Sequence, residues 1–455
     1  MTYAVRAEDQ ADSGRHAGVF SLRVWRCHLV LGLAAVAAGG GSLYFIYAER
    51  WSLAFTRAAM QLSPYLPAII VAVGMIVISR LRDRVFPGTE GTGIPQAIAA
   101  LQMGDTPDRS RLLSLRIAVG KLVLLTLGLF SGATLGREGP SVHLAACCLY
   151  VSRRFAPYPR HLVERGLILA GGAAGIAAAF NAPIAGIVFA FEEIGRSFDK
   201  RNAAAIVRTV AIACIVCIIP LSNYLFFGQV GAQLRTAQEW LLAPAIGVVG
   251  GLLGGCFAQA VANTTPRIAR LVRRRPYAVA GSLGLALAVL GALSGGLTYG
   301  GGDEQVHSIL INGESLPAIY PLVKAAGSFV TLVSGIPGGL FTPCLSVGAG
   351  LGQLIAGLVP TVNRQAVILL AMGAYFAGVV QSPITATVIM FEMTAARAMV
   401  LPLVLATAIA YEASHLVCPT SLYEALAMSF LRRHATPLPA APAPCVEAAG
   451  AVLSP

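Results

Sequence analysis

One acidic residue stands inside the most apolar part of the sequence. Glu138 belongs to the run Gly-Arg-Glu-Gly-Pro at 136–140, with a long apolar stretch on either side. A carboxylate at the centre of a membrane helix costs roughly 2.5–3.5 kcal/mol on insertion scales. Pro140 predicts a helix start, so Glu138 would lie at an amino-terminal helix end, where free amides and the helix dipole favour negative charge. Such a place can also hold a halide, although a simple ion pair with Arg137 is the alternative.

Two glycine-rich turns have a similar character. In Gly-Thr-Gly-Ile-Pro at 91–95, Thr92 can cap the following helix, and the glycines beside it let a ligand approach the backbone. In Gly-Ile-Pro-Gly-Gly-Leu-Phe-Thr-Pro at 335–343, the amides of Leu340 and Phe341 would point toward an anion at the start of the next helix. Ordinary N-capping and an ordinary glycine turn are the alternatives for these two places.

Two more residues could take part in the same chemistry. The hydroxyl of Tyr423 could donate to a halide without placing a fixed positive charge in a pore, although tyrosines of this kind also line membrane interfaces. Glu193 ends an apolar segment just before Arg196 and Lys200, where it could collect protons from the cytoplasm. Pairing of Glu193 with those bases is the alternative.

The elements that must position these residues are membrane helices. Of the 455 residues, 56% are hydrophobic and only 12% are charged, and the mean hydropathy is +0.72, which excludes a water-soluble domain. Apolar runs such as 29–48, 203–228 and 278–298 approach the roughly 20 residues that cross a bilayer as a helix. They lack the in/out alternation of a membrane β-barrel. The sequence therefore predicts an all-α polytopic membrane protein.

The net charge of +12 arises from short basic clusters between the apolar runs. This distribution is typical of cytoplasmic loops under the positive-inside rule and disfavours nucleic-acid binding. We expect residues 1–26 to be a cytoplasmic amino-terminal segment, 27–431 to form the membrane domain, and 432–455, rich in Ala and Pro, to be a disordered cytoplasmic tail.

Forty-nine glycines and 26 prolines interrupt the apolar segments, and helices broken inside a membrane survive only where they line a cavity or pack within protein. The sequence also repeats itself. The segment 181–192 begins Asn-Ala-Pro-Ile and ends Phe-Glu, and 381–392 begins Gln-Ser-Pro-Ile and ends Phe-Glu. We therefore predict two related halves, at about 30–230 and 235–430, as in many transporters.

In order and spacing, the two turns, the Glu138 motif and Tyr423 resemble the CLC family of chloride channels and transporters. The signatures of that family are GSGIP, GREGP, a GxFxP stretch and a tyrosine on the last membrane helix. The resemblance covers about Arg26 to Leu431, and Ala-Phe-Asn-Ala-Pro at 179–183 also fits it. It implies broken, tilted helices in two inverted-topology repeats, and a homodimer in which each subunit has its own pore.

The resemblance also implies roles for particular residues. The anion would be held by the hydroxyls of Thr92 and Tyr423 and the amides of Leu340 and Phe341. The gating glutamate of the family falls on Glu138, and its inner proton-transfer glutamate falls on Glu193. Where the family usually has serine, this sequence has Thr92, which keeps the donor hydroxyl but adds a methyl group that could alter selectivity.

These assignments predict chloride/proton antiport with a glutamate gate. The alternative is a voltage- or proton-gated chloride channel of the same family, and fluoride or nitrate selectivity is a further possibility. We expect no cofactor and no metal site, with chloride, protons and the lipid bilayer as partners in a multi-pass protein of a cell inner membrane.

Other classes of function find little support. The histidines at 28, 143, 307 and 415 form no HExxH, and no GxSxG is present, so an intramembrane enzyme is disfavoured. The absence of a GxxxxGK[ST] loop disfavours an ATP-driven pump. A cation/proton antiporter would need several carboxylates facing the pore, whereas Glu138 is the only one central to an anion-type motif. The nine cysteines, mostly inside apolar runs, are expected to be buried and inert.

Overall fold

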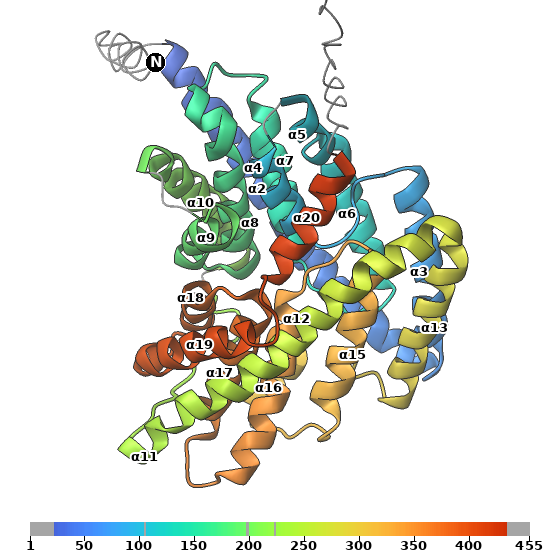
Figure 1. Ribbon diagram of the computed structural model, residues 1–455, viewed down its shortest axis with the longest axis vertical. Coiled ribbons are helices and arrows are strands. Elements are labelled where there is room, and N and C mark those ends of the chain that lie inside the picture. The colour runs from blue at the N-terminus through green and yellow to red at the C-terminus, as the bar shows by residue number, and fades with distance from the viewer. Residues whose placement is uncertain (1–21, 104–105, 197–199, 223, 435–455) are drawn as a thin grey trace, which may run out of the picture.

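The computed structural model describes residues 22–103, 106–196, 200–222 and 224–434 (Figure 1). Within these ranges every regular element is a helix, and the only extended pairing is one isolated bridge. The prediction of an all-α fold is confirmed. Helix α2 begins at Leu22, and the last helix, α20, continues to His434. Residues 1–21, and the part of the predicted tail after His434, lie outside the described residues.

The helices follow one another along the chain with short connections. In order they are α2 (Leu22–Leu62), α3 (Leu66–Arg84), α4 (Ile94–Gln102), α5 (Thr106–Leu112), α6 (Leu115–Phe130), α7 (Glu138–Ser152), η1 (Leu162–Gly166), α8 (Leu167–Phe180), α9 (Pro183–Phe189), η2 (Ala190–Ile194), α10 (Lys200–Leu221), α11 (Ala237–Trp240), α12 (Leu242–Arg274), α13 (Pro276–Leu293), α14 (Asp303–Leu310), α15 (Tyr320–Val333), α16 (Phe341–Leu358), α17 (Arg364–Val380), α18 (Pro383–Thr394), η3 (Arg397–Met399), α19 (Val400–His415) and α20 (Leu422–His434).

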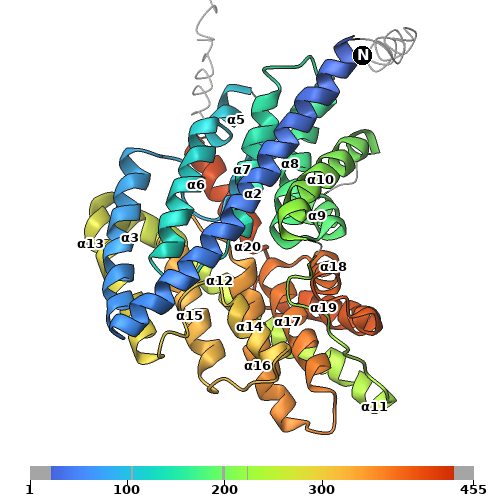
Figure 2. The same ribbon diagram turned by 180° about the vertical axis from the view of Figure 1, so that it is seen from behind.

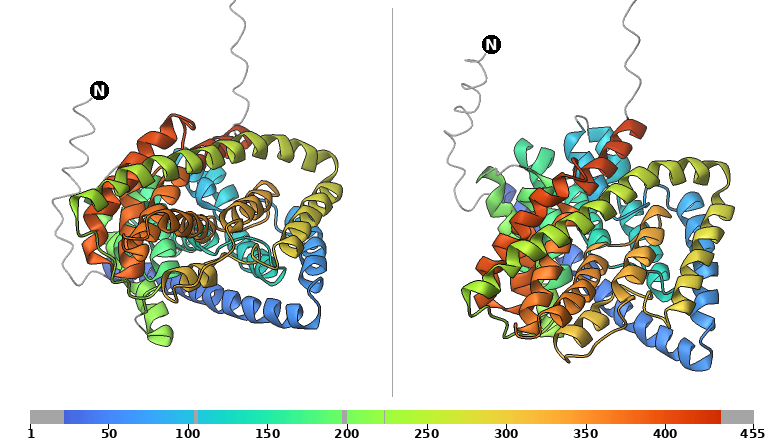
Figure 3. Two further views of the ribbon diagram at one scale, coloured as in Figure 1. Left: turned by 90° about the horizontal axis from the view of Figure 1, so that it is seen from below. Right: turned by 60° about the horizontal axis from the view of Figure 1, so that its bottom comes forward.

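Seven helical segments of the described residues are long and apolar enough to cross a membrane. They are Leu22–Leu62, Arg109–Phe130, Lys200–Leu221, Ala237–Arg274, Pro276–Leu293, Phe341–Leu358 and Arg397–His415. The two longest, α2 and α12, cross opposite faces of the molecule diagonally (Figures 1 and 2). Seen from below, they form two edges with shorter helices between them (Figure 3). Shorter apolar helices such as α8 and α17 are therefore shielded inside the protein, as broken membrane helices must be.

The interruptions follow from local chemistry. Asn181 and Gln381 end α8 and α17 in the left-handed conformation, with φ of 55° and 60°. The next residue in each case is nearly identical in backbone conformation, with φ −129° and ψ 79° at Ala182 and φ −129° and ψ 81° at Ser382. A proline then starts the following helix at its first position, where the missing amide hydrogen costs nothing. Equal dihedral angles 200 residues apart support the predicted repeat.

An approximate two-fold relation links the halves. The helix series α2, α3, α4, α6, α7, α8, α9 and α10 corresponds to α12, α13, α14, α15, α16, α17, α18 and α19. The isolated bridge joins Gly136, which precedes α7, to Gly339, which precedes α16, and each amide donates to the other's carbonyl at 3.0 and 2.6 Å. Equivalent residues that bind each other reciprocally lie at a two-fold axis. In Figure 1, α2 descends from the top whereas α12 rises from the bottom, so the halves are inverted.

A reciprocal pair of carboxylate caps crosses the boundary between the halves. Glu192, at the end of the first repeat segment, accepts hydrogen bonds from the amides of Ile384 and Thr385 at the start of α18. Glu392 accepts from the amides of Ile184 and Ala185 at the start of α9. Each half thus satisfies the free amides at a helix start in the other half, which stabilises the broken segments at the interface.

Two buried lysines extend the symmetry to residues that were not among the matches found in the sequence. Lys121 on α6 donates to the carbonyl of Gly91 at 2.6 Å, and Lys324 on α15 donates to the carbonyl of Gly300 at 2.9 Å. Both glycines have positive φ, 67° and 68°, and both lie three residues before a short helix, α4 or α14. The turn that carries Thr92 therefore has a glycine-only counterpart at 300–302.

Candidate functional site

Glu138 is the first residue of α7 and is completely buried. Its Oε1 accepts hydrogen bonds from the backbone amide of Thr342, at 3.2 Å, and from the Thr342 hydroxyl. Thr342 is the second residue of α16, so the carboxylate of one half lies against the helix start of the other. Its second oxygen, Oε2, has no hydrogen-bond partner among the described residues. The carboxylate therefore lies where a helix-start amide and a hydroxyl favour negative charge, and one of its oxygens has no partner within the described ranges.

Three helix starts meet at this place. The bridge between Gly136 and Gly339 brings the starts of α7 and α16 together. The turn before α4 packs on the first turn of α7, so closely that a Cβ on Gly139 would lie 2.7 Å from the Thr92 carbonyl oxygen. Only glycine allows this approach at 139. The amino-terminal ends of α4, α7 and α16 consequently direct their partial positive charge into one region.

The two hydroxyls predicted to bind an anion are both buried. Within the described residues, neither Thr92 Oγ1 nor Tyr423 Oη has a hydrogen-bond partner. The Tyr423 ring lies 6.3 Å from the ring of Phe341, the first residue of α16. A buried hydroxyl without a partner costs about 1–3 kcal/mol, so two of them beside three helix starts point to a ligand that accepts hydrogen bonds.

Leu340 and Phe341 lie at the N-cap and first position of α16, where backbone amides have no acceptor inside the helix. The Phe341 ring is held by three other phenylalanine rings, with centroids 4.7–6.1 Å apart: Phe180, Phe189 and Phe376. This aromatic cluster fixes the start of α16 and surrounds it with apolar surface, which strengthens electrostatic interactions there.

Arg137 makes its ion pair with Glu49 on α2, away from its neighbour Glu138. A second guanidinium nitrogen donates to the carbonyl of Ala179 at 3.1 Å. The arginine thus ties α2 and the end of α8 to the motif at 136–140. The simple pairing of Glu138 with Arg137, open as an alternative from the sequence, is not the arrangement found.

Glu193 lies on the π-helical turn η2 and is buried. Its Oε2 accepts from the hydroxyl of Ser382, while Oε1 has no partner in the described part of the chain. The nearby base Arg196 pairs instead with Glu424, at 2.7 Å. Tyr423, next to Glu424 in the chain, interacts electrostatically with both Glu193 and Glu138.

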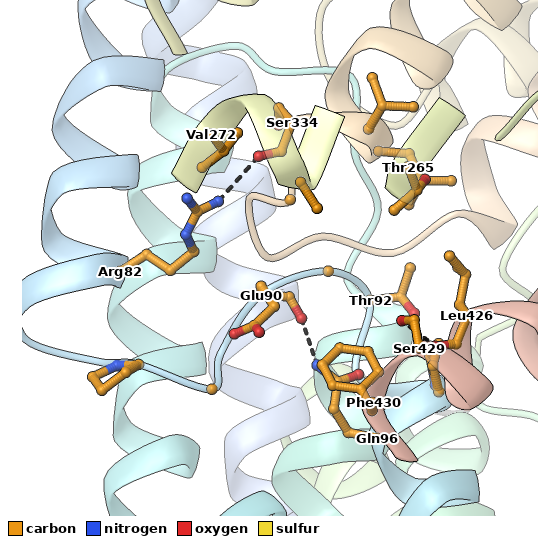
Figure 4. Close-up of a pocket in the computed structure, with 18 of the residues that line it drawn as sticks. Arg82, Glu90, Thr92, Gln96, Thr265, Val272, Ser334, Leu426, Ser429 and Phe430 are labelled. Atoms are coloured by element: carbon orange, nitrogen blue, oxygen red, sulfur yellow. Dashed lines mark hydrogen bonds between the residues drawn. The ribbon is translucent and has the colours of Figure 1, made fainter. Parts of the chain in front are cut away.

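A cavity of about 340 Å³ leads to the Thr92 side of this region (Figure 4). Its walls come from the segment after α3, the end of α12, the end of α15 and the last helix α20; lining residues include Arg82, Glu90, Thr265, Ser334 and Phe430. A second cavity, of about 400 Å³, is lined by Arg137 and Glu49 together with Tyr224, Asp303 and His307. Thr92 lines the first cavity, and Arg137, the chain neighbour of Glu138, lines the second, so each cavity reaches a residue of the site or one next to it.

Several contributors were not among the residues chosen from the sequence: Glu49, Lys121, Thr342 and Ser382. Thr342 lies inside the motif at 335–343, and a hydroxyl at the second position of a helix is a signal that could have been used. Ser382 could have been noted as the residue before the repeated Pro-Ile. Glu49 directly follows the first apolar run and pairs with a residue 88 positions away, which only folding reveals. In the described residues no group of three or more His, Cys, Asp or Glu could hold a metal ion.

Comparison with known proteins agrees with the geometry. The sequence model of the family described as voltage gated chloride channel matches residues 74–415, most of the chain. The chain belongs to this family. It is 30% identical over 380 residues to the H(+)/Cl(−) exchange transporter ClcA of Yersinia pestis, which covers 78% of this chain and 73% of the relative. It is 31% identical over 337 residues to a ClcB-like chloride channel protein of Ralstonia nicotianae, covering 69% and 75%.

Solved structures of the family have the same fold. A slow cyanobacterial Cl−/H+ antiporter superposes with a TM-score of 0.78 at 23% identity, over 89% of this chain and 98% of the other. A CLC-type fluoride/proton antiporter superposes with a TM-score of 0.74 at 23% identity, over 90% and 99%. The predicted CLC-type fold of broken helices is confirmed.

Proposed function

We propose that this protein is a transporter, and not an enzyme, that exchanges chloride for protons across a membrane. The observation that carries the proposal is the buried Glu138 carboxylate at the meeting point of three helix starts, held by Thr342. Relatives named as H(+)/Cl(−) exchange transporters support the choice of ions. The seven membrane-length helices agree with a multi-pass membrane protein.

Chloride entering the protein must lose water, and hydrogen-bond donors must replace it. The hydroxyls of Thr92 and Tyr423 and the amides of Leu340 and Phe341 supply these donors. Helix starts provide partial charge, about half a unit each, and donors that are already aimed inward. Binding is then strong enough for entry and weak enough for release, which a fully charged lysine at the same place would prevent.

Glu138 competes with the anion. Ionised, its carboxylate accepts hydrogen bonds at the start of α16 and blocks the place of a chloride ion. Protonated, it loses the attraction of the amide donors and leaves. Proton binding and anion passage are therefore coupled at one side chain, so that acidification opens the path.

A proton needs a second station to cross the protein. Glu193 is buried and has one carboxyl oxygen without a partner among the residues described. We assign it the inner proton-transfer role. Its hydrogen bond from Ser382 orients the carboxyl group and leaves the other oxygen available to a proton or water.

A gated chloride channel is the second candidate, and the similarity to the ClcB-like chloride channel protein favours it. The same anion site would then conduct chloride while Glu138 only opens and closes the path. The fluoride/proton antiporter of similar fold makes anion preference a question for the same experiment. We propose chloride because Thr92 keeps the hydroxyl donor of the usual serine.

We further propose a homodimer in a cell inner membrane, with the membrane domain at about 27–431 between cytoplasmic ends at 1–26 and 432–455. Helices α9, α10, α18 and α19 expose large apolar side chains that suit lipid or a second copy of the chain; examples are Ile184, Ile219, Ile384 and Leu401. Cross-linking in lipid vesicles between cysteines introduced on this face would detect a dimer, and monomeric protein throughout would exclude it.

The decisive test is a flux assay on the purified protein in liposomes, recording chloride, nitrate or fluoride movement together with pH. We expect an outward chloride gradient to drive protons inward in a fixed ratio. Chloride flux with no proton movement would establish the channel, and collapse of a diffusion potential by sodium instead of chloride would exclude both proposals.

A further inference from the structure

We propose that the hydroxyl of Thr342 is a latch for the gate: it holds the ionised Glu138 carboxylate in place and thereby sets the pH at which anion flux begins. This inference rests on the proposed gating role of Glu138 and adds a residue that determines when the gate opens. The geometry behind it is a pair of donors from one residue, the amide and the hydroxyl of Thr342, on a single carboxylate oxygen.

The position of Thr342 makes this pairing possible. It is the second residue of α16, where the backbone amide has no acceptor within the helix and points toward Glu138. Its side chain is buried, and the backbone of the turn at 300–302 packs behind it, since a Cβ on Gly301 would lie 3.2 Å from the Thr342 methyl carbon. The hydroxyl is thus held facing the carboxylate.

The backbone amide of Thr342 can donate to either an anion or a carboxylate, and a side-chain substitution leaves it in place. The hydroxyl is the donor that a substitution can remove. A hydrogen bond from a neutral donor to a charged acceptor is among the strong ones in proteins. When Glu138 takes up a proton and leaves, the same hydroxyl faces the vacated place and can donate to the anion that enters. The latch and the anion then compete for one donor.

Other groups also act on Glu138 and must be kept constant in any test. Electrostatic interactions reach it from its own loop, from α2 and from α16 and α20; the groups are Arg137, Glu49, Cys344 and Tyr423. Thr342 is distinguished from all of these because it alone donates hydrogen bonds to the carboxylate among the described side chains.

The test measures chloride flux in liposomes as a function of pH for Thr342→Val, Thr342→Ser and the unmodified chain. Valine has nearly the same shape as threonine and lacks the hydroxyl, so the ionised carboxylate loses a donor. We expect the midpoint of the pH–flux curve to move up by about one unit, which corresponds to a tenfold higher affinity of Glu138 for protons. Serine restores the hydroxyl, so Thr342→Ser should keep the original midpoint.

The matched control is Thr134→Val, which removes another buried threonine hydroxyl of the same region, one that donates to the carbonyl of Thr298. If Thr134→Val moves the midpoint as far as Thr342→Val does, the effect is general loosening and the latch is wrong. An unchanged midpoint in Thr342→Val, with the protein monodisperse in detergent, also overturns it. If Thr342→Val fails to fold, a midpoint in Thr342→Ser that differs from the unmodified chain by a full unit would contradict the latch, and retention of the midpoint would support it.

A Glu138→Gln background separates this inference from the proposed function. In that background we expect flux that no longer depends on pH, and Thr342→Val should then change only the chloride concentration at half-maximal flux, by about threefold to tenfold. If Glu138→Gln keeps the pH dependence, the gate itself is wrong. If it removes the pH dependence and Thr342→Val has no effect in either background, only the latch is wrong.

Discussion

The two halves of the molecule share a backbone and differ in the chemistry they carry. Pro140 and Pro343 lie in matching helix starts, yet two residues earlier the first half has Glu138 and the second has Phe341. The backbone of each half supplies amides at a helix end. Only the first half adds a titratable group at this position, whereas the second half adds an aromatic ring and hydrogen-bond donors. The two halves therefore form matching helix starts whose side chains differ.

The same contrast appears at the other carboxyl group. Glu192 and Glu392 correspond and cap helices reciprocally, but the next residue is Glu193 in the first half and Met393 in the second. Both proposed proton-carrying residues thus come from the first half. The second half binds them, through Thr342 and Ser382.

We expect the largest effect from replacing Glu138, the titratable residue that the second half lacks at the equivalent position. Glu138→Gln is neutral at every pH and cannot compete with an anion as a carboxylate does. We expect chloride flux that is nearly independent of pH and a loss of proton coupling, measured as chloride efflux between pH 4.5 and 7.5. In the unmodified chain flux should rise as pH falls, because protonation releases the carboxyl group. If Glu138→Gln still shows a rise of chloride flux as pH falls, Glu138 is not the residue that makes the two halves differ in function.

We expect the next largest effect from replacing Glu193, the carboxyl group whose equivalent in the second half is Met393. With Glu193→Gln, we expect proton uptake driven by a chloride gradient to fall by more than about tenfold, which corresponds to roughly 1.4 kcal/mol. Chloride flux should continue, since the anion donors are untouched. Met393→Gln is the matched control, because it places the same amide at the equivalent position of the second half. Equal losses of proton uptake in both variants would mean that the position, and not the carboxyl group, matters.

Tyr423 lies on α20, a helix that has no counterpart in the series of paired helices. Tyr423→Phe removes a buried hydroxyl that has no protein partner among the described residues. If chloride accepts its hydrogen bond, the chloride concentration at half-maximal flux should rise about fivefold, as for the loss of one hydrogen bond of about 1 kcal/mol. An unchanged or lower value would remove the tyrosine from the anion site.

We expect the smallest effect from changing the reciprocal helix caps, a feature that the two halves share. Glu192→Gln and Glu392→Gln each weaken a carboxylate cap on the opposite half. We expect both to lower the free energy of unfolding by about 1 kcal/mol, the usual size of a helix-cap contribution. Thermal unfolding in detergent would measure this as a small decrease of midpoint temperature. The backbone donors of the two caps correspond, but Glu192 also accepts a hydrogen bond from the Thr385 hydroxyl, at 2.6 Å. Glu192→Gln should therefore give the somewhat larger decrease, and a larger decrease in Glu392→Gln would contradict this comparison.

The repeat could be found in the sequence only where side chains had stayed alike. The Pro-Ile and Phe-Glu matches revealed 181–192 and 381–392, because a proline start and a carboxylate cap need particular residues. The pairing of the turns at 91–93 and 300–302 was missed, since one carries Thr92 and the other only glycine. Positive φ at Gly91 and Gly300, and a lysine on each carbonyl, made them equivalent in the folded chain.

Sequence alone determined the membrane class, the all-helical fold, the family and the residues most worth examining. Those features depend on local quantities: hydropathy, the placement of proline and glycine, and motif spacing. The sequence could not decide which side chains form ion pairs or hydrogen bonds with each other. The tertiary structure pairs Arg137 with Glu49, Arg196 with Glu424, and Thr342 with Glu138. Such contacts join positions 88, 228 and 204 residues apart, and their existence depends on how helices cross in space, which no local pattern specifies.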